Sequence, residues 1–144
     1  MRFCLLFSIA MVGTLLTGCA VSNAQISQPL LEDSAWLAED IDGTGVIDML
    51  QSTLKFDDNL NVSGHGGCNR YFGSATVNEN KIVFGALGST RMACSQAIMS
   101  QEQRFLTALD SAHTWKIDTE RGLLTMKNEE GNTILRFSRL TPPD

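Results

Sequence analysis

RYFGSATVNENKIVF, residues 70–84, shows the alternation from which the fold class can be predicted. Successive side chains of a β-strand point to opposite faces, so residues two positions apart share a face. One such face is formed by Tyr71, Gly73, Ala75 and Val77. The polar stretch Asn-Glu-Asn at 78–80 predicts a turn into a second strand, Lys81–Phe84. Two strands joined by so short a turn are expected to pair antiparallel.

The same alternation of apolar and polar residues recurs on both sides of this hairpin. Further strands are expected at residues 36–41, 53–57, 60–63, 114–118, 123–127 and 133–140. Short runs rich in Asp, Asn, Glu and Gly separate several of them, as at 57–59 and 120–122. The pattern therefore predicts a mainly β chain in which sequence neighbours pair antiparallel.

One segment has helical periodicity instead. Its apolar residues at helical spacing are Ile98, Phe105, Leu106 and Leu109. Ser100 and Gln103 have the spacing of a capping box, and we expect the helix to begin at Gln96 or Ser100 and to end at Asp110. The predicted fold is mainly β (α+β): a curled antiparallel, barrel-like sheet of about eight strands with one α-helix packed on or in it.

The N-terminus has the features of a bacterial secretion signal. Arg2 is followed by an almost entirely apolar run, residues 3–16, which is shorter than the roughly 20 residues of a membrane-spanning helix. The next residues, Leu-Thr-Gly and then Cys19, resemble a lipobox, in which the cysteine accepts lipid. We expect residues 1–18 to be a lipoprotein signal peptide and Cys19 to be the lipidated N-terminus. A signal without lipidation and an uncleaved anchor are the alternatives.

These features predict the domain organisation and the location. Residues 19–33 are expected to form the lipidated N-terminus and a flexible tether, followed by one domain at 34–140 and a tail at 141–144. Ala20 stands where an aspartate retains lipoproteins in the inner membrane of enteric bacteria, which favours the outer membrane, facing the periplasm. Through the lipid anchor, we expect the membrane as a partner. The net charge is −5 and the sequence has no basic cluster, so we expect no nucleic-acid partner.

Two blocks, GCNRY at 67–71 and STRMAC at 89–94, resemble the META domain, also called the heat-shock HslJ-like family. The resemblance covers about Ser34 to Leu140. Other matching positions are Trp36-Leu37, Phe56, residues 62–64, Glu102, Phe105, Leu109, Trp115, Leu123-Leu124 and residues 135–137. It implies a strand-rich, barrel-like fold with one helix, found in small bacterial envelope lipoproteins with relatives in trypanosomatid parasites. It also implies a link to heat shock, antibiotic tolerance or virulence, without a defined biochemical activity.

Cys68 and Cys94 are the two cysteines downstream of Cys19. In an oxidising compartment such cysteines usually pair, and the bridge would stabilise the domain by roughly 3–4 kcal/mol in the chain-entropy model. Free buried thiols and a reactive redox or nucleophilic pair are the alternatives. Because the two cysteines do not form a Cys-x-x-Cys motif, we predict a structural disulfide.

The glycine-rich run at 63–69 and the two histidines are weaker candidates for chemistry. No Gly-Lys-Ser/Thr follows the glycines, so the run predicts a strand end, a bulge and a turn that positions Cys68, and not a phosphate loop. His65 and His113 are possible metal ligands or catalytic bases, but zinc ligands usually come in close pairs and only His65 has a cysteine nearby. We expect no metal, no cofactor and no catalytic residue.

Asn69, Arg70 and Arg91 lie beside the cysteines in the sequence. They are the candidates for contact with an anionic ligand or with a carboxylate of a partner, because guanidinium groups bind such anions in a bidentate manner. In the alternative interpretation, each arginine pairs with a local acid such as Glu102 and orders the loops.

The function class follows from these expectations. We predict a non-catalytic envelope lipoprotein that supports stress tolerance by binding an undefined protein, peptidoglycan or a small ligand. One alternative is a periplasmic enzyme or redox protein that uses Cys68 and Cys94 or His65. Another is a holdase for envelope proteins, which would need an exposed apolar patch.

Overall fold

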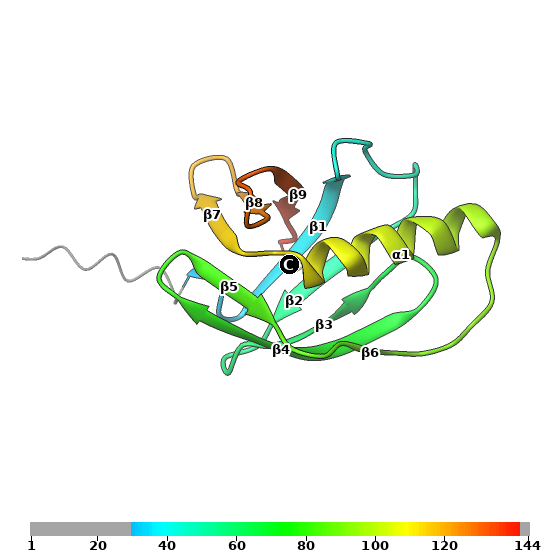
Figure 1. The fold of residues 1–144 in the computed structure, drawn as a ribbon, viewed down its shortest axis with the longest axis horizontal. Helices are drawn as coiled ribbons and strands as arrows, with labels where there is room; N and C mark the ends of the chain where they lie inside the picture. Colours follow the sequence, from blue (N-terminus) through cyan, green and yellow to red (C-terminus); the bar gives the residue numbers. More distant parts are fainter. Residues whose placement is uncertain (1–29, 142–144) are drawn as a thin grey trace, which may run out of the picture.

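Nine strands and one helix follow one another in residues 30–141, the part of the chain that this computed structural model describes. In chain order they are β1 (Ser34–Ile41), β2 (Thr53–Phe56), β3 (Asn61–His65), β4 (Arg70–Asn78), β5 (Lys81–Phe84), β6 (Gly88–Ser89), α1 (Gln96–Asp110), β7 (Thr114–Asp118), β8 (Leu123–Lys127) and β9 (Thr133–Arg139). The strand order is β3-β2-β1-β9-β8-β7-β5-β4, and an additional β3–β4 pairing closes the sheet into an eight-stranded barrel. The predicted antiparallel barrel with one helix is therefore confirmed (Figure 1).

Chain neighbours account for most of the pairings, as the short turns predict. In the hairpin at 70–84, Val77 faces Ile82 across β4 and β5. Two pairings join segments that are far apart in sequence, β1 with β9 and β5 with β7. The β5–β7 contact has a single register pair, Lys81 with Thr114, so it is the narrowest seam of the barrel. Strand β6, which pairs with β4, was not predicted because two residues are too short to show an alternation.

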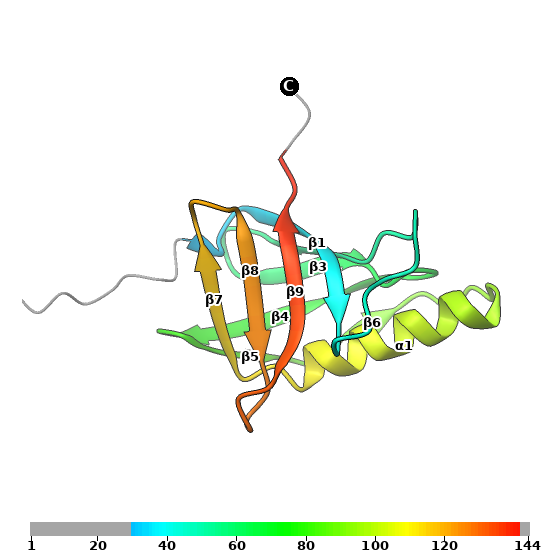
Figure 2. The ribbon, with the colours of Figure 1, turned by 90° about the horizontal axis from the view of Figure 1, so that it is seen from above.

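Helix α1 begins at Gln96, the earlier of the two predicted starts, with Ser95 as its N-cap residue. The predicted capping box is wrong: Ser100 lies inside the helix, and the Gln103 side chain donates to the Thr107 hydroxyl, 3.2 Å away. The helix continues one turn further back because its apolar periodicity already includes Ile98. Figure 2 shows α1 lying against the end of the barrel at which β1 stops, with its first turns extending beyond the strands.

Aromatic side chains fill the barrel interior. Phe105 reaches in from α1, and its ring centroid lies 5.8 Å from that of Tyr71 and 6.2 Å from that of Phe137. The other buried rings are those of Trp36, Phe56, Phe84 and Trp115. Tyr71 also donates its hydroxyl to the Thr53 carbonyl, so the helix end of the barrel is packed core and not a ligand mouth.

The start of β1 and the segment that precedes it also pack on the core. Leu31 is fully buried in the core, although the sequence placed it in the flexible tether, so the packed part of the chain includes residues before Ser34. The Trp36 indole donates to the Ser34 hydroxyl. The Arg139 guanidinium lies over the Trp36 ring, with its central carbon 4.6 Å from the ring centroid. The predicted signal peptide, Cys19 and most of the predicted tether and tail lie outside the described residues.

Candidate functional site

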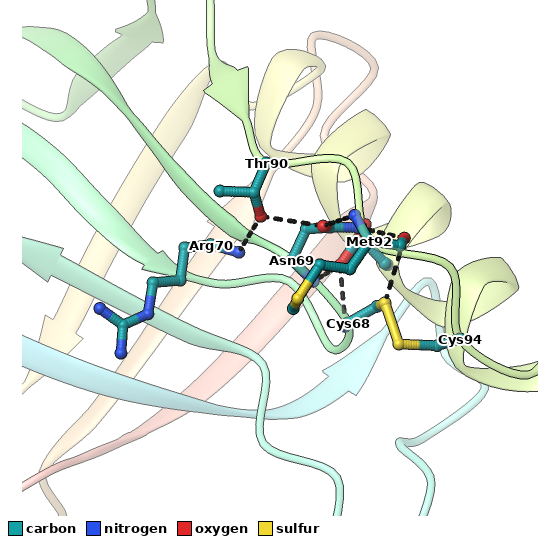
Figure 3. Close-up of a disulfide and its surroundings, with 7 residues drawn as sticks. Cys68, Asn69, Arg70, Thr90, Met92 and Cys94 are labelled. Atoms are coloured by element: carbon teal, nitrogen blue, oxygen red, sulfur yellow. Dashed lines mark hydrogen bonds between the residues drawn. A yellow bond between two sulfur atoms is a disulfide. The ribbon is translucent and has the colours of Figure 1, made fainter.

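The two motif blocks meet at a disulfide. Cys68 and Cys94 are bonded, with their Cα atoms 6.0 Å apart, which joins the turn after β3 to the segment before α1 (Figure 3). Cys68 is buried and also lies 3.4 Å from the carbonyl oxygen of Met92. The predicted structural bridge is thus present, and neither sulfur is a thiolate that can attack a substrate or ligate a metal.

Asn69 connects the same two blocks through its side chain. Its amide oxygen accepts from the Thr90 hydroxyl (2.8 Å) and the Met92 backbone N–H (2.6 Å). Its amide nitrogen donates to the Met92 carbonyl (3.3 Å) and to a carboxylate oxygen of Glu102 (2.8 Å). All four hydrogen bonds that an asparagine side chain can form are made within the fold, and the residue is only 4% exposed. The structure therefore gives Asn69 a structural role in place of the predicted ligand contact.

Glu102 is the group that sequence reasoning misinterpreted. It points from α1 to the turn after β3, where one carboxylate oxygen accepts from the backbone N–H groups of Cys68 and Asn69. The side chain is only 8% exposed, and these donors, with the Asn69 amide, take the place of the arginine that the alternative interpretation of the sequence had paired with Glu102. A Cβ at Gly66 would lie 2.7 Å from the Glu102 side chain, so the glycine leaves room for the carboxylate. The signal for this role in the sequence was the position of Glu102 on the apolar face of the predicted helix.

Gln101 forms a second buried contact on the same turn of α1. Its amide oxygen accepts from the backbone N–H of Ile47 (2.7 Å), and its amide nitrogen donates to the Ser52 hydroxyl (3.3 Å). Ser52 in turn donates to the Gly66 carbonyl (2.7 Å). We call Gln101 and Glu102 the helix clasp, because together they hold the loop between β1 and β2 and the turn after β3 against α1.

Arg70 and Arg91, the remaining predicted contact residues, are both exposed. Arg70 is held by its backbone, which exchanges hydrogen bonds with Thr90, while its guanidinium points away from the disulfide (Figure 3). Within residues 30–141, the ion pairs within 4.0 Å are Arg121 with Asp118 and Arg136 with Asp40, so neither predicted arginine is paired with Glu102. Their contact with an anionic ligand stays a prediction.

An open groove of about 460 Å³ lies on the outer face of the barrel along β2. Thr53 and Lys55 face outward there because they alternate with the buried Leu54 and Phe56. The Thr53 hydroxyl accepts from the backbone N–H of His65 (3.1 Å), which brings the histidine to the groove. The lining residues are Met49, Gln51, Thr53, Lys55, His65, Gly67 and Leu140. Among them, the sequence had indicated His65 and the glycine-rich run that contains Gly67. The other lining residues come from a loop, a neighbouring strand and the end of the domain.

A smaller cavity of about 290 Å³ is formed by the β7–β8 hairpin and Asn80, with Lys116 and Lys127 among its lining residues. His113 lies at the start of that hairpin, where its carbonyl accepts a hydrogen bond from the Ile82 backbone N–H and its own N–H donates to the Lys127 carbonyl. Among the described residues, no three His, Cys, Asp or Glu side chains gather in a cluster that would hold a metal ion. In the same part of the chain, no helix has both the length and the hydrophobicity of a membrane span.

These features define a small antiparallel β-barrel, closed at one end by a helix, whose most specific motifs brace a disulfide-linked turn. Residues 29–140 match the profile of the META domain family, and the chain belongs to this family. A protein from Burkholderia xenovorans, solved by NMR, is similar at 30% identity and a TM-score of 0.65, over 79% of this chain and 86% of that one.

Two more distant structures show the same fold. One is a protein solved by NMR, with 19% identity and a TM-score of 0.62 over 78% of this chain and 94% of that one. The other is a DUF4847 family protein from Bacteroides vulgatus, solved by crystallography, with 13% identity and a TM-score of 0.56 over 77% of this chain and 95% of that one. Among curated proteins, no relative matches the chain.

Proposed function

We propose that the protein is a non-catalytic, lipid-anchored module of the bacterial envelope, similar to HslJ, which supports tolerance of heat or antibiotic stress by binding a partner or ligand. The observation that carries this proposal is the use of the motif's polar groups. Cys68 is bonded to Cys94, and Asn69 and Glu102 direct their hydrogen bonds to each other and to neighbouring backbone. Groups engaged in this way hold the fold together and are not free to act on a substrate.

The anchor in this proposal is Cys19, and the location is the periplasmic side of the outer membrane. The lipobox-like sequence before Cys19 and the residue after it support both parts of the proposal. The disulfide adds support for an oxidising compartment, because such bonds persist outside the cytosol. Lipid chains on Cys19 would hold the barrel within a tether's length of the membrane and so keep it close to envelope partners.

The alternative of an enzyme or redox protein rested on Cys68 and Cys94 or on His65, and because the cysteines are bonded to each other, His65 is the candidate that remains. An activated nucleophile needs a base within hydrogen-bond reach and a third group that orients the base. The hydrogen bond described for His65 is made by its backbone N–H and not by its ring. Because a catalytic base would need a hydrogen bond from its ring to an orienting group, the backbone contact of His65 favours a binding role for the surface that His65 lines.

Complementation of a strain that lacks the gene tests the proposal. Survival after heat or antibiotic exposure should be restored by the wild-type protein and by a Cys68→Ala/Cys94→Ala double variant, at a growth temperature at which the variant accumulates. A Cys19→Ala variant should fail to restore survival although its barrel is intact. Immunoblots of the membrane fraction serve as the control for protein level and anchoring.

Two results would contradict the proposal. Failure of the double cysteine variant at wild-type protein level would assign a chemical role to the sulfur atoms. Full rescue by Cys19→Ala would show that the lipid anchor is dispensable.

A further inference from the structure

We propose that the groove along β2 binds an extended acidic peptide, with a carboxylate of the peptide held between Lys55 and His65. The inference rests on the proposed binding function and deepens it, because it names the surface and the class of ligand. Three features of the groove support it: its strand-like shape, its charge and an exposed apolar side chain at its edge.

The shape of the groove follows from the alternation in and before β2. Gln51, Thr53 and Lys55 face outward at every second position, while Ser52 and Leu54 are buried. Alternate residues of a strand repeat at about 6.6–6.8 Å, which is also the repeat of an extended peptide. A peptide laid along this row meets the amide of Gln51 and the hydroxyl of Thr53 before it reaches Lys55. The volume of about 460 Å³ lies within the range of sites for small ligands.

The charge of the groove is opposite to that of the chain. The protein carries a net charge of −5, yet the lining includes Lys55 and His65 and no carboxylate. Arg70 lies directly opposite His65 in the β3–β4 register and adds a third basic group to this face. Neither Lys55 nor Arg70 forms an ion pair within 4.0 Å with another residue of 30–141. A ligand carboxylate would therefore supply the negative charge that these basic side chains do not find within the described chain.

Met49 provides the third observation. Its side chain is fully exposed at the groove, and its backbone is left-handed, with a φ of 64°. Such a backbone costs free energy for a residue that has a side chain. Four other residues of the described chain that are not glycine share it, so what distinguishes Met49 is its full exposure beside the groove. Together with Leu140, Met49 offers an apolar contact for a ligand side chain next to the basic end of the groove.

The test is a calorimetric titration of the full-length protein in detergent. The probe is the N-acetylated, C-terminally amidated tetrapeptide Leu-Ala-Glu-Glu, and its matched control is Leu-Ala-Gln-Gln with the same end groups. We expect the acidic peptide to bind at least tenfold more tightly than the neutral one. A Lys55→Gln/His65→Gln variant should lose at least tenfold in affinity for the acidic peptide, with an unchanged melting temperature. Lys127→Gln, which removes a lysine from the other cavity, should leave the affinity unchanged.

Several outcomes would overturn the inference. Equal affinity for the two peptides would show that the carboxylates play no part in binding. If Lys127→Gln lost as much affinity as Lys55→Gln/His65→Gln, binding would depend on the overall charge of the protein and not on the groove. Displacement by acetate at the same carboxylate concentration would identify an anion site without peptide recognition. Preferential binding to vesicles of phosphatidylglycerol would assign the surface to lipid.

Rescue of the deletion strain separates this inference from the proposed function. If the protein binds neither peptide and the Lys55→Gln/His65→Gln variant still restores stress survival, the groove inference fails while the binding function stands. If the wild type itself does not restore survival, the proposed function fails, whatever the titration shows.

Discussion

Replacing Glu102 with glutamine should destabilise the protein far more than the loss of one negative charge would suggest. The Glu102 carboxylate accepts three hydrogen bonds, two from the backbone N–H groups of Cys68 and Asn69 and one from the Asn69 side-chain amide. In Glu102→Gln, one orientation of the new amide directs its NH₂ group at another donor, and the other orientation loses both backbone contacts. A hydrogen bond to a charged group contributes about 1.5–3 kcal/mol, and a buried unsatisfied donor costs about 1–3 kcal/mol. We therefore expect the free energy of unfolding to fall by roughly 2–4 kcal/mol.

Urea unfolding followed by far-UV circular dichroism, with the disulfide intact, measures this change. Glu130→Gln is the matched control, because it removes the same charge from an exposed turn between β8 and β9 and should change stability by less than about 0.5 kcal/mol. If Glu102→Gln were as mild as Glu130→Gln, the helix clasp would not hold the motif turn, and the structural account of the motif would be refuted.

The remaining predictions concern the disulfide, the motif glycine and an exposed turn. Cys68→Ala/Cys94→Ala should lower the free energy of unfolding by roughly 3–4 kcal/mol, because the unfolded chain regains loop entropy, and urea melts of oxidised and reduced wild type check the value. Gly66→Ala should cost about 1–3 kcal/mol in the same assay, since its Cβ would lie 2.7 Å from a side-chain carbon of α1; an unchanged midpoint would contradict this. The Asn61 side chain lowers the pKa of Asp57 below its usual 3.8, so the stability that Asp57 contributes is present above that pH and is lost as the pH falls through the lower value. Asp57→Asn should therefore lose less stability than the wild type between neutral pH and pH 3, and parallel acid curves would speak against this assignment.

The barrel could be predicted from the sequence because its signals are local. The alternation in residues 70–84 correctly indicated β4 and β5, since hairpin strands separated by a short turn have no other partner as near. Strand β6 and the burial of Leu31 were missed for a different reason. Two residues are too few to show a period. Leu31 and its neighbour Leu30 stand in a polar stretch, and only the finished barrel decides that Leu31 is buried while Leu30 stays exposed.

The site could be predicted only where chemistry limits the partners. Two cysteines in an oxidising compartment have each other as the obvious partner, so the bridge was foreseen. Glu102 had many conceivable partners, and its contact with backbone N–H groups more than thirty residues away depends on how α1 lies against the turn after β3. The groove along β2 was also missed as a unit, because Met49, His65 and Leu140 come together only through tertiary packing.

The central claim of a lipid-anchored module with a structural disulfide is tested most directly by the intact mass of the protein extracted from its native membrane, with thiols alkylated before and after reduction. The account predicts a chain that begins at an acylated Cys19 and incorporates alkyl groups at Cys68 and Cys94 only after reduction. A mass without acyl chains would contradict the anchor, and cysteines that are alkylated without reduction would contradict the structural role of the motif.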